Sequence, residues 1–479
     1  MTLADFAPMI PLIAVALGAV LALLAAAFFR RPGVSLAVVL ASFAAGLSLL
    51  AVAWPLGVRR VSSLLIVDRA SIFAMGLVLV STLLAALISS RTVKARQGER
   101  GEYYALLALA ALGASVLASS THFATFFLGQ EVLSVSLYSL IAYRRENPKA
   151  GDAGMKYLVL GGVSSSFLLF GMALLYADLG TMEFSPMAAA FSGGAGGVLS
   201  VCGFAMMVVG IGFKLAVVPF HLWSPDVYEG APAPVAALVA TTSKGAVFSL
   251  LVRFFPREEG VVPAPFFLVF ALISGLSMIV GNVLALREKN VKRILAYSSI
   301  AHLGYLLVAF LAGGDAGGTA AAYYLVTYFA ASIGSFGTVS ALSQGDREAD
   351  ALEDFRGLAW RKPWLAGAFT VMLLSLAGLP LTAGFLGKLS LFMAGMGSRA
   401  WYLGVVLAAG SVVGLFYYLK LITEMFRSGG SAEVKGAIRS PVPVPAAAVL
   451  AFLTLVTVWL GISPDPLLAV LRLAGGAAP

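Results

Sequence analysis

Residues 207–223, MVVGIGFKLAVVPFHLW, form an apolar run that holds one lysine, Lys214, and one proline, Pro219. An ionisable group at membrane depth is unfavourable by about 2.5–3.5 kcal/mol, so a lysine there indicates a function. Proline removes a backbone donor and frees a carbonyl, which predicts that this helix breaks inside the bilayer. Transporters bind ions where half-helix ends and free carbonyls face a cavity. The run therefore predicts an all-α integral membrane protein that moves an ion.

A second run of this kind, LLSLAGLPLTAGFLGKLSLF at residues 373–392, combines Pro380 with Lys388. Gly384 and Gly387 interrupt it further. The two proline-broken runs lie five spans apart, which gives them opposite orientations in the membrane. Inverted repeats that each contain a broken helix are typical of transporters.

The composition of the whole chain agrees with a membrane body. Of its 479 residues, 60% are apolar and 11% are charged, whereas an ordinary soluble domain carries about 25% charged residues. The net charge of +9 does not indicate nucleic-acid binding, because the basic residues lie in short loops between apolar runs, where lipid headgroups account for them. The single cysteine, Cys202, excludes an internal disulfide and a cysteine-ligated cluster, so any redox cofactor must lie on another chain.

Length and apolar character predict about fourteen membrane-spanning helices. We place them at residues 8–29, 33–55, 69–90, 103–120, 123–143, 155–177, 197–222, 231–255, 265–286, 293–312, 319–343, 363–397, 400–427 and 442–462. Ser192–Gly197 and Gly313–Gly318 are predicted loops. The longest hydrophilic stretches, Gln344–Lys362 and Arg427–Ser440, are too short to fold as a soluble domain.

The distribution of basic residues predicts the orientation. Loops after odd-numbered spans carry 21 Lys and Arg residues, against 7 in the even-numbered loops and the C-terminal tail. The positive-inside rule then places the odd loops in the cytoplasm and both termini in the periplasm. The N-terminus has Asp5 and no basic region, which predicts a first span and not a cleaved signal peptide.

Two further groups within predicted spans are candidates for proton transfer. Glu131 shares its helix face with Ser134 and Tyr138, and the alternative is a helix–helix hydrogen-bond site. Lys244 follows three hydroxyl residues, which suits a water-wired proton path. The alternative for Lys244 is a structural ion pair with a loop acid such as Asp226 or Glu229.

The two histidines within predicted spans are weaker candidates for proton transfer. His302 has Ser298 and Tyr305 on its helix face, and a relay and a satisfied core residue are equally compatible with this pattern. His221 lies seven residues after Lys214, but the break between them leaves their relation open. We expect Lys420 and Glu424, four residues apart, to form a structural ion pair instead of a proton path.

Lysine suits this task because its proton affinity depends strongly on its surroundings. Its pKa is about 10.4 in water, and burial of a lysine can lower this value by about 3–5 units. A carboxylate about 4 Å away contributes roughly 4 kcal/mol in the opposite direction at an effective dielectric of about 20. Movement of Glu131 relative to Lys214 is therefore predicted to switch proton binding.

Four segments carry a resemblance to a known family: GQEVLSVSLYSLIAYRRENPKAGDAGMKY, GFKLAVVPFHLWSPDVYEGAPAPVAALVATTSK, ALREKNVKRILAYSSIAHLGY and SLAGLPLTAGFLGKLSLF. They resemble the antiporter-like membrane subunits of respiratory complex I, the bacterial proton-translocating NADH:quinone oxidoreductase, over about residues 100–430. PDVYEGAP and LAGLPLTAGFLGK favour the N-type branch over the L and M types and over sodium/proton antiporters.

This resemblance implies fourteen transmembrane helices with two inverted five-helix repeats. It divides the chain into three N-terminal transmembrane helices at 1–100, a first repeat at 101–256, a second repeat at 257–430, and a C-terminal helix with its tail at 431–479. It also implies a proton relay through the family's carboxylate and lysines, which match Glu131, Lys214, Lys244 and Lys388. The match of His302 to the family's histidine region is looser.

The resemblance further implies the partners and the location of the chain. It would be a subunit of a translocase in the bacterial inner membrane, surrounded by lipid and other membrane subunits. NADH, FMN, iron–sulfur clusters and quinone would bind partner subunits, and no cofactor or metal is expected in this chain. A secondary Na⁺/H⁺ antiporter subunit is the alternative, and a purely structural scaffold is disfavoured by the buried charges.

Overall fold

The computed structural model describes residues 7–29, 31–90, 93, 101–144, 146–192, 197–255, 264–343, 347–427 and 441–475. Thirteen helical segments within these residues are long and apolar enough to cross a membrane. Twelve of them are α1 (Ile10–Phe29), α2 (Pro32–Ala53), α3 (Arg69–Ile88), α5 (Glu102–Ser119), α6 (Phe123–Ile141), α7 (Pro148–Leu179), α9 (Val198–Leu215), α13 (Ala264–Arg287), α14 (Val291–Ala312), α15 (Gly314–Leu342), α19 (Trp401–Phe426) and α20 (Val444–Ile462).

The thirteenth segment joins α11 (Ala233–Leu238) through a π-helical turn, η3 (Val239–Ser243), to α12 (Lys244–Phe254). Two shorter apolar helices, α17 (Pro363–Ala377) and α18 (Ala383–Met396), occupy the predicted twelfth span. With this pair counted as one crossing, the all-α membrane fold and its predicted number of spans are confirmed.

The remaining elements are short and lie between or after these helices. They are η2 (Trp54–Leu56), α8 (Phe184–Ser192), α10 (Trp223–Gly230), η4 (Leu352–Phe355), α16 (Leu358–Arg361) and α21 (Asp465–Gly475). Strands β1 (Arg59–Arg60) and β2 (Ile66–Val67) form an antiparallel pair in which Arg59 lies opposite Val67.

One of the predicted loops differs from the structure, and two other predicted stretches lie mostly outside the described residues. The loop predicted at Gly313–Gly318 is wrong, because α15 begins at Gly314 and its glycines lie within the helix. Tertiary packing overrides the low helix propensity of glycine here, and Gly317 sits against the Ala309 carbonyl of α14. Most of the loop predicted at Ser192–Gly197 and of the stretch predicted at Arg427–Ser440 lies outside the described residues.

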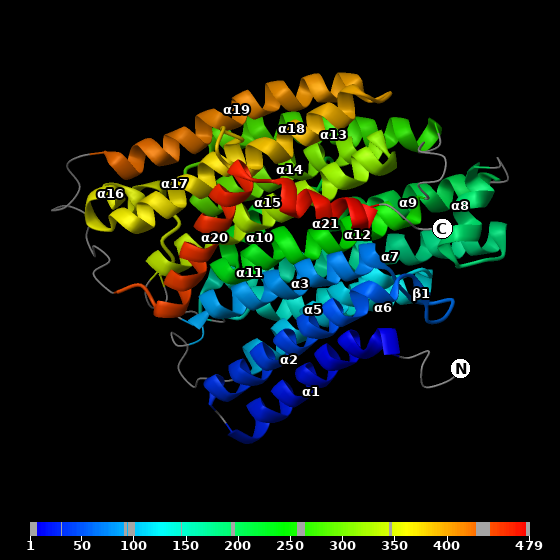
Figure 1. Ribbon diagram of the computed structural model, residues 1–479, viewed down its shortest axis with the longest axis horizontal. Helices are drawn as coiled ribbons and strands as arrows, with labels where there is room; N and C mark the ends of the chain where they lie inside the picture. The colour runs from blue at the N-terminus through cyan, green and yellow to red at the C-terminus, as the bar shows by residue number, and fades with distance from the viewer. Residues whose placement is uncertain are drawn as a thin grey trace.

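The helices lie side by side, with α1 and α2 at one edge of the bundle and α19 at the opposite edge (Figure 1). Closely packed pairs include α1 with α2, α5 with α6, α7 with α9, and α13 with α14. Helices α14 and α15 are almost wholly buried and form the middle of the bundle. The outer helices expose large apolar side chains, which is the surface that lipid tails require.

Contacts between loops agree with the predicted alternation of the spans. Residues from the loops after the fifth, seventh, ninth and eleventh spans meet at one end of the bundle, in the pairs Lys149–Glu229, Arg293–Asp226, Lys292–Glu348 and Asn290–Asp350. Residues from the even-numbered loops meet in the pairs Leu65–Ser120, His122–Glu183 and Asp68–Arg253. Odd loops thus join odd loops, as they must when each predicted span crosses once.

The buried Asp68 carboxylate at the start of helix α3 makes two kinds of contact. The Asp68 side chain accepts the Ser71 backbone N–H at 2.7 Å, which caps the helix. The same carboxylate accepts two hydrogen bonds of 2.8 Å from Arg253, at the end of α12. Asp68 therefore connects the start of the third span to the end of the eighth span through its ion pair with Arg253.

Replacing Asp68 with asparagine is expected to lower the free energy of unfolding by about 1.5–3 kcal/mol at pH 7, because a charge-assisted hydrogen bond is lost. Burial raises the pKa of Asp68, but Arg253 outweighs burial and holds that pKa below its ordinary value. The stabilisation is therefore complete above about pH 4 and is lost as pH falls through the folded pKa. Melting temperatures of purified wild-type and Asp68→Asn protein, measured from pH 7 to pH 3, should converge at low pH. A constant difference over that range would contradict this assignment.

Candidate functional site

The first helix break lies between α9 and α10 and contains Pro219. Helix α9 ends at Leu215, and Ala216 adopts a left-handed conformation with φ of 56°. The Phe213 carbonyl accepts the indole N–H of Trp223 at 3.1 Å. Polar groups that the break releases from the helical pattern are thus bonded within the protein, as a membrane interior requires.

The second break lies between α17 and α18 and contains Pro380. Helix α17 ends at Ala377, followed by Gly378 with φ of 82°. A side chain at residue 378 would be strained by this φ, and its Cβ would lie 2.7 Å from Cδ of Lys388. At this break, the backbone of Gly378 therefore packs directly against the Lys388 side chain.

The two lysines lie on opposite sides of their breaks. Lys214 is in the last turn of α9, before the break. Lys388 belongs to α18, after the break, and its Nζ donates to the Ala377 carbonyl at 2.9 Å, at the end of α17. Both ammonium groups are therefore near the C-terminal end of a half-helix, where the helix dipole favours positive charge.

Lys214 is buried next to the helix that carries Glu131. Its Nζ donates to Ser134 Oγ at 2.6 Å and lies 5.2 Å from the centre of the Tyr157 ring. The Glu131 carboxylate is within electrostatic reach of Lys214 and accepts a hydrogen bond from Ser165 Oγ at 2.7 Å. Two serines thus bond the acid and the amine, and a small movement of α6 would change the separation of Glu131 from Lys214.

Lys244 is almost completely buried at the start of α12. Its Nζ donates to Ser299 Oγ at 2.6 Å, and Tyr328 OH donates to the same oxygen at 2.8 Å. The alternative pairing with a loop acid is not formed, because Asp226 instead bonds Lys156 and Arg293. Lys244 therefore connects to α14 and α15, the middle of the bundle.

His302 on α14 stands between Lys244 and Lys388. It is within electrostatic reach of both lysines. Its Nδ1 is hydrogen-bonded to Tyr324 OH, and its Nε2 lies 3.2 Å from Tyr418 OH. Its ring centre is 5.1 Å from that of Tyr328, which bonds the serine shared with Lys244.

Lys388 is the last charged group in this series, and its ammonium packs against an aromatic ring. Its Nζ lies 5.1 Å from the centre of the Tyr305 ring. Tyr305 OH accepts from Asn282 Nδ2 at 2.8 Å, and Asn282 Oδ1 accepts from Tyr417 OH at 3.1 Å. Charged, hydroxyl and aromatic groups therefore follow one another at contact distances from Lys244 to Lys388, through Ser299, Tyr328, His302 and Tyr305. We call the partly buried Glu131 and the buried Lys214, Lys244, His302 and Lys388 the buried row.

His221 has no recorded side-chain hydrogen bond to the row, and one predicted ion pair is not formed in the structure. His221 lies in the turn after the first break, is buried, and contributes an Nδ1 that has no hydrogen-bond partner among the described residues. The predicted Lys420–Glu424 ion pair is wrong: Lys420 donates to the Glu288 carbonyl at 3.1 Å. Glu424 is instead paired with Arg427 and Arg356, because loop residues at this helix end offer it closer cations.

Ser134 and Tyr305 were named from the sequence, but several other neutral partners of the buried row were missed. They are Ser165, Tyr228, Ser299, Tyr324, Tyr328 and Tyr418. Tyr324 and Tyr328 are four residues apart in an apolar helix, so their shared polar face was a signal in the sequence. The partners on other helices had no such signal, because tertiary packing alone brings them to the row.

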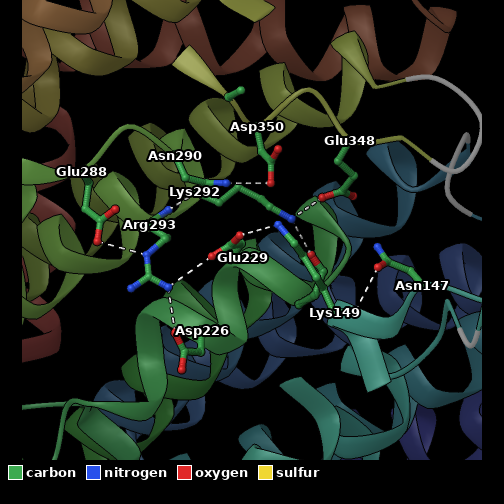
Figure 2. Close-up of polar contacts among 12 residues, drawn as sticks. Asn147, Lys149, Asp226, Glu229, Glu288, Asn290, Lys292, Arg293, Glu348 and Asp350 are labelled. Atoms are coloured by element: carbon green, nitrogen blue, oxygen red, sulfur yellow. Dashed lines mark hydrogen bonds and ion pairs between the residues drawn. The ribbon is translucent and has the colours of Figure 1, made fainter. Parts of the chain in front are cut away.

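An ionic cluster joins α10, the start of α14 and the segment before η4 (Figure 2). Arg293, at the start of α14, bonds Asp226 at 2.7 Å and Glu229 at 3.1 Å, both on α10. Burial raises the pKa of Asp226, but Lys156 and Arg293 outweigh it and hold that pKa below its ordinary value. The cluster thus ties the short helix after the first break to the helix that carries Ser299 and His302.

Lys292 and Glu348 form the most buried ion pair of this cluster. Glu348 also lies 3.6 Å from Arg144 and accepts the Ala233 backbone N–H at 3.0 Å. Lys292 also donates to the Ala231 carbonyl at 3.0 Å. The carboxylate therefore fixes the start of α11, which continues through η3 to Lys244.

Among the residues that the structure describes, no three or more His, Cys, Asp or Glu side chains gather as a metal-binding group. The described part of the site consists of lysines, one histidine, one carboxylate and neutral hydroxyl or amide groups. Such groups transfer protons through hydrogen bonds and water.

The fold and the buried row define a polytopic membrane protein with the architecture of an ion transporter. A family model described as NADH:quinone oxidoreductase/Mrp antiporter, TM, matches residues 120–414. NADH-quinone oxidoreductase subunit N of Methylococcus capsulatus is 41% identical over 98% of this chain and 95% of its own length. The chain therefore belongs to the antiporter-like membrane subunit family, and its curated relatives are N subunits of NADH-quinone oxidoreductase.

Solved structures agree with this assignment. A chain of respiratory complex I from Thermus thermophilus, solved with bound aureothin, is 34% identical with a TM-score of 0.83. The match covers 97% of this chain and 100% of that chain. A chain of the Mrp complex from Dietzia sp. DQ12-45-1b shares the fold, with a TM-score of 0.84 at 22% identity over 99% of this chain and 97% of its own length.

Proposed function

We propose that this chain is the N-type proton-translocating membrane subunit of an NADH:quinone oxidoreductase. One observation carries the proposal: the buried row runs through the middle of the bundle between two helix breaks, with a hydroxyl or aromatic partner at each lysine. Its curated relatives of nearly equal length carry this subunit name, which supports the same role here.

We propose protons, and not sodium ions, as the transported ion because most of the charged groups in the row are lysines. Three buried lysines would repel a sodium ion wherever they carry a proton, whereas each lysine can itself bind and release a proton. Sodium is bound by oxygen ligands such as carboxylates and carbonyls, and the row contains one carboxylate, Glu131. A secondary Na⁺/H⁺ antiporter subunit is the alternative that the shared fold with the Mrp chain keeps open.

In the proposed mechanism, Glu131 and Lys214 act as a switch. When the carboxylate approaches, Lys214 holds its proton, and when α6 moves away the proton passes towards Lys244. Ser134, which Lys214 bonds, and Ser299, which Lys244 bonds, would orient water for these steps. His302 and its tyrosines would connect Lys244 to Lys388.

The proposal extends to location, partners and internal symmetry. The chain would lie in the bacterial inner membrane with both termini in the periplasm and the ionic cluster at the cytoplasmic end. It would assemble with other membrane subunits, while partner subunits bind NADH, FMN, iron–sulfur clusters and quinone. Residues 101–256 and 257–430 would be two inverted five-helix repeats, each containing one of the two breaks.

The test is to purify the chain gently from its native membranes and to record an EPR spectrum of what co-purifies. A large assembly with reducible iron–sulfur signals is expected, together with NADH-driven proton uptake into vesicles that contain no sodium. A small assembly without these signals, with proton movement that requires sodium, would contradict the proposal and favour the antiporter.

A further inference from the structure

Gln130, the residue before Glu131, is completely buried inside the bundle. Neither the nitrogen nor the oxygen of its side-chain amide has a hydrogen-bond partner among the described residues. A buried amide with neither group bonded is strongly unfavourable, and buried amides in proteins are bonded to protein or to ordered water. This amide therefore requires partners that the neighbouring side chains do not supply.

The position of Gln130 connects it to Lys214. The Gln130 backbone carbonyl accepts a hydrogen bond from Ser134 Oγ at 2.6 Å, and Ser134 Oγ in turn accepts one from the Lys214 ammonium at 2.6 Å. Gln130 and Ser134 are four residues apart on α6, so their Cβ atoms are about 5–6 Å apart on one helix face. The amide thus lies one turn along the helix from the hydroxyl that holds Lys214.

Donors and acceptors at this place are complementary. Lys214 has three N–H donors, and Ser134 is the one hydrogen-bond acceptor recorded for them among the described residues. The Gln130 amide offers two donors and an acceptor. A bridging water bonds groups that are too far apart for direct contact, and a polar interior site with several such partners is where water is retained.

We propose that Gln130 holds ordered water against Ser134 and Lys214, and that this water takes part in proton exchange at Lys214. Gln130 holds and orients this water and does not itself exchange the proton, so it is a positioning residue. This inference rests on the proposed proton relay, and it adds a hydrated pocket on the face of α6 next to the one that carries Glu131.

The functional test uses the complete assembled complex reconstituted into vesicles. Gln130→Leu keeps the approximate size of the side chain and removes its hydrogen bonds. Protons translocated through the complex per unit time should fall about tenfold, the effect of one lost hydrogen bond on a transfer step. Gln130→Asn, which keeps an amide, should recover part of the rate. Ser136→Ala is the matched control on α6, because its hydroxyl bonds only the Val132 carbonyl, and it should behave like the wild type.

The structural test is a cryo-electron density map of the wild-type complex in which waters are resolved. At least one water is expected at about 2.7–3.2 Å from the Gln130 amide, and it should be absent in Gln130→Leu. An amide bonded to protein groups alone, or wild-type proton translocation by Gln130→Leu, would overturn the inference. Neither result affects the proposed function, which fails separately if Lys214→Met leaves proton translocation intact.

Discussion

Lys244→Met in the assembled complex is expected to lower the rate of NADH-driven proton translocation by about 10²-fold, the lower end of the range for loss of an acid–base group. Methionine has a similar length and no proton to exchange. Lys244 is connected to His302 through Ser299 and Tyr328, and its single recorded hydrogen bond goes to Ser299. Proton uptake into vesicles and NADH oxidation, measured together, give the rate and its coupling.

A second variant separates proton transfer from electrostatics. Lys244→Arg keeps the positive charge, but arginine does not give up its proton in proteins, so it should be as impaired as Lys244→Met. Ser249→Ala on the same helix is the control, since its hydroxyl bonds the Gly245 carbonyl one turn away. Retention of proton translocation by Lys244→Arg would show that Lys244 contributes a fixed charge only. Co-purification of the iron–sulfur signals with each variant checks assembly.

The helices and the charged members of the row could be predicted because both depend on strong local signals. An apolar run of about 20 residues has few stable alternatives to a membrane helix. Within such a run, a lysine beside a proline, as in Lys214 with Pro219 and Lys388 with Pro380, is conspicuous because it is costly. These residues lie at or beside the two breaks, where the sequence pattern placed them.

The partners of the row that come from distant helices could not be predicted. Ser299 meets Lys244 across 55 residues, and Tyr418 meets His302 across 116. Serine and tyrosine are common in apolar helices, and their presence alone does not say which of them face a lysine. The start of α15 at Gly314 was also missed, because packing against α14 outweighs the usual preference of glycine for loops.

The ionic cluster gives the buried row a rigid frame at one end. Its members come from loops that carry no apolar pattern, and ion pairs hold α10 and α11 against α14. Lys244 lies in the middle of the row, and the single π-helical turn η3 separates it from the end of α11. A shift at the start of α11 would therefore move Lys244 relative to Ser299.

Glu348→Ala should lower the free energy of unfolding by about 3–5 kcal/mol, because it removes one partner of a buried ion pair. Lys292, with a side chain only 1% exposed, would keep its charge without a carboxylate, and the Ala233 N–H would lose its acceptor. The expected result is a strongly lowered melting temperature and a smaller yield of assembled complex. Thermal unfolding of the purified complex followed by intrinsic tryptophan fluorescence would measure it.

Lys149→Ala is the matched control in the same cluster. Its ammonium pairs with Glu229 at 2.7 Å, but its side chain is 66% exposed, so the loss should stay below about 1 kcal/mol. The double variant Lys292→Met with Glu348→Gln removes both charges and keeps an acceptor for Ala233. It should be more stable than Glu348→Ala, because no uncompensated ammonium remains buried. Equal destabilisation by Glu348→Ala and Lys149→Ala would mean that burial does not set the strength of these pairs and would contradict the role given to Glu348.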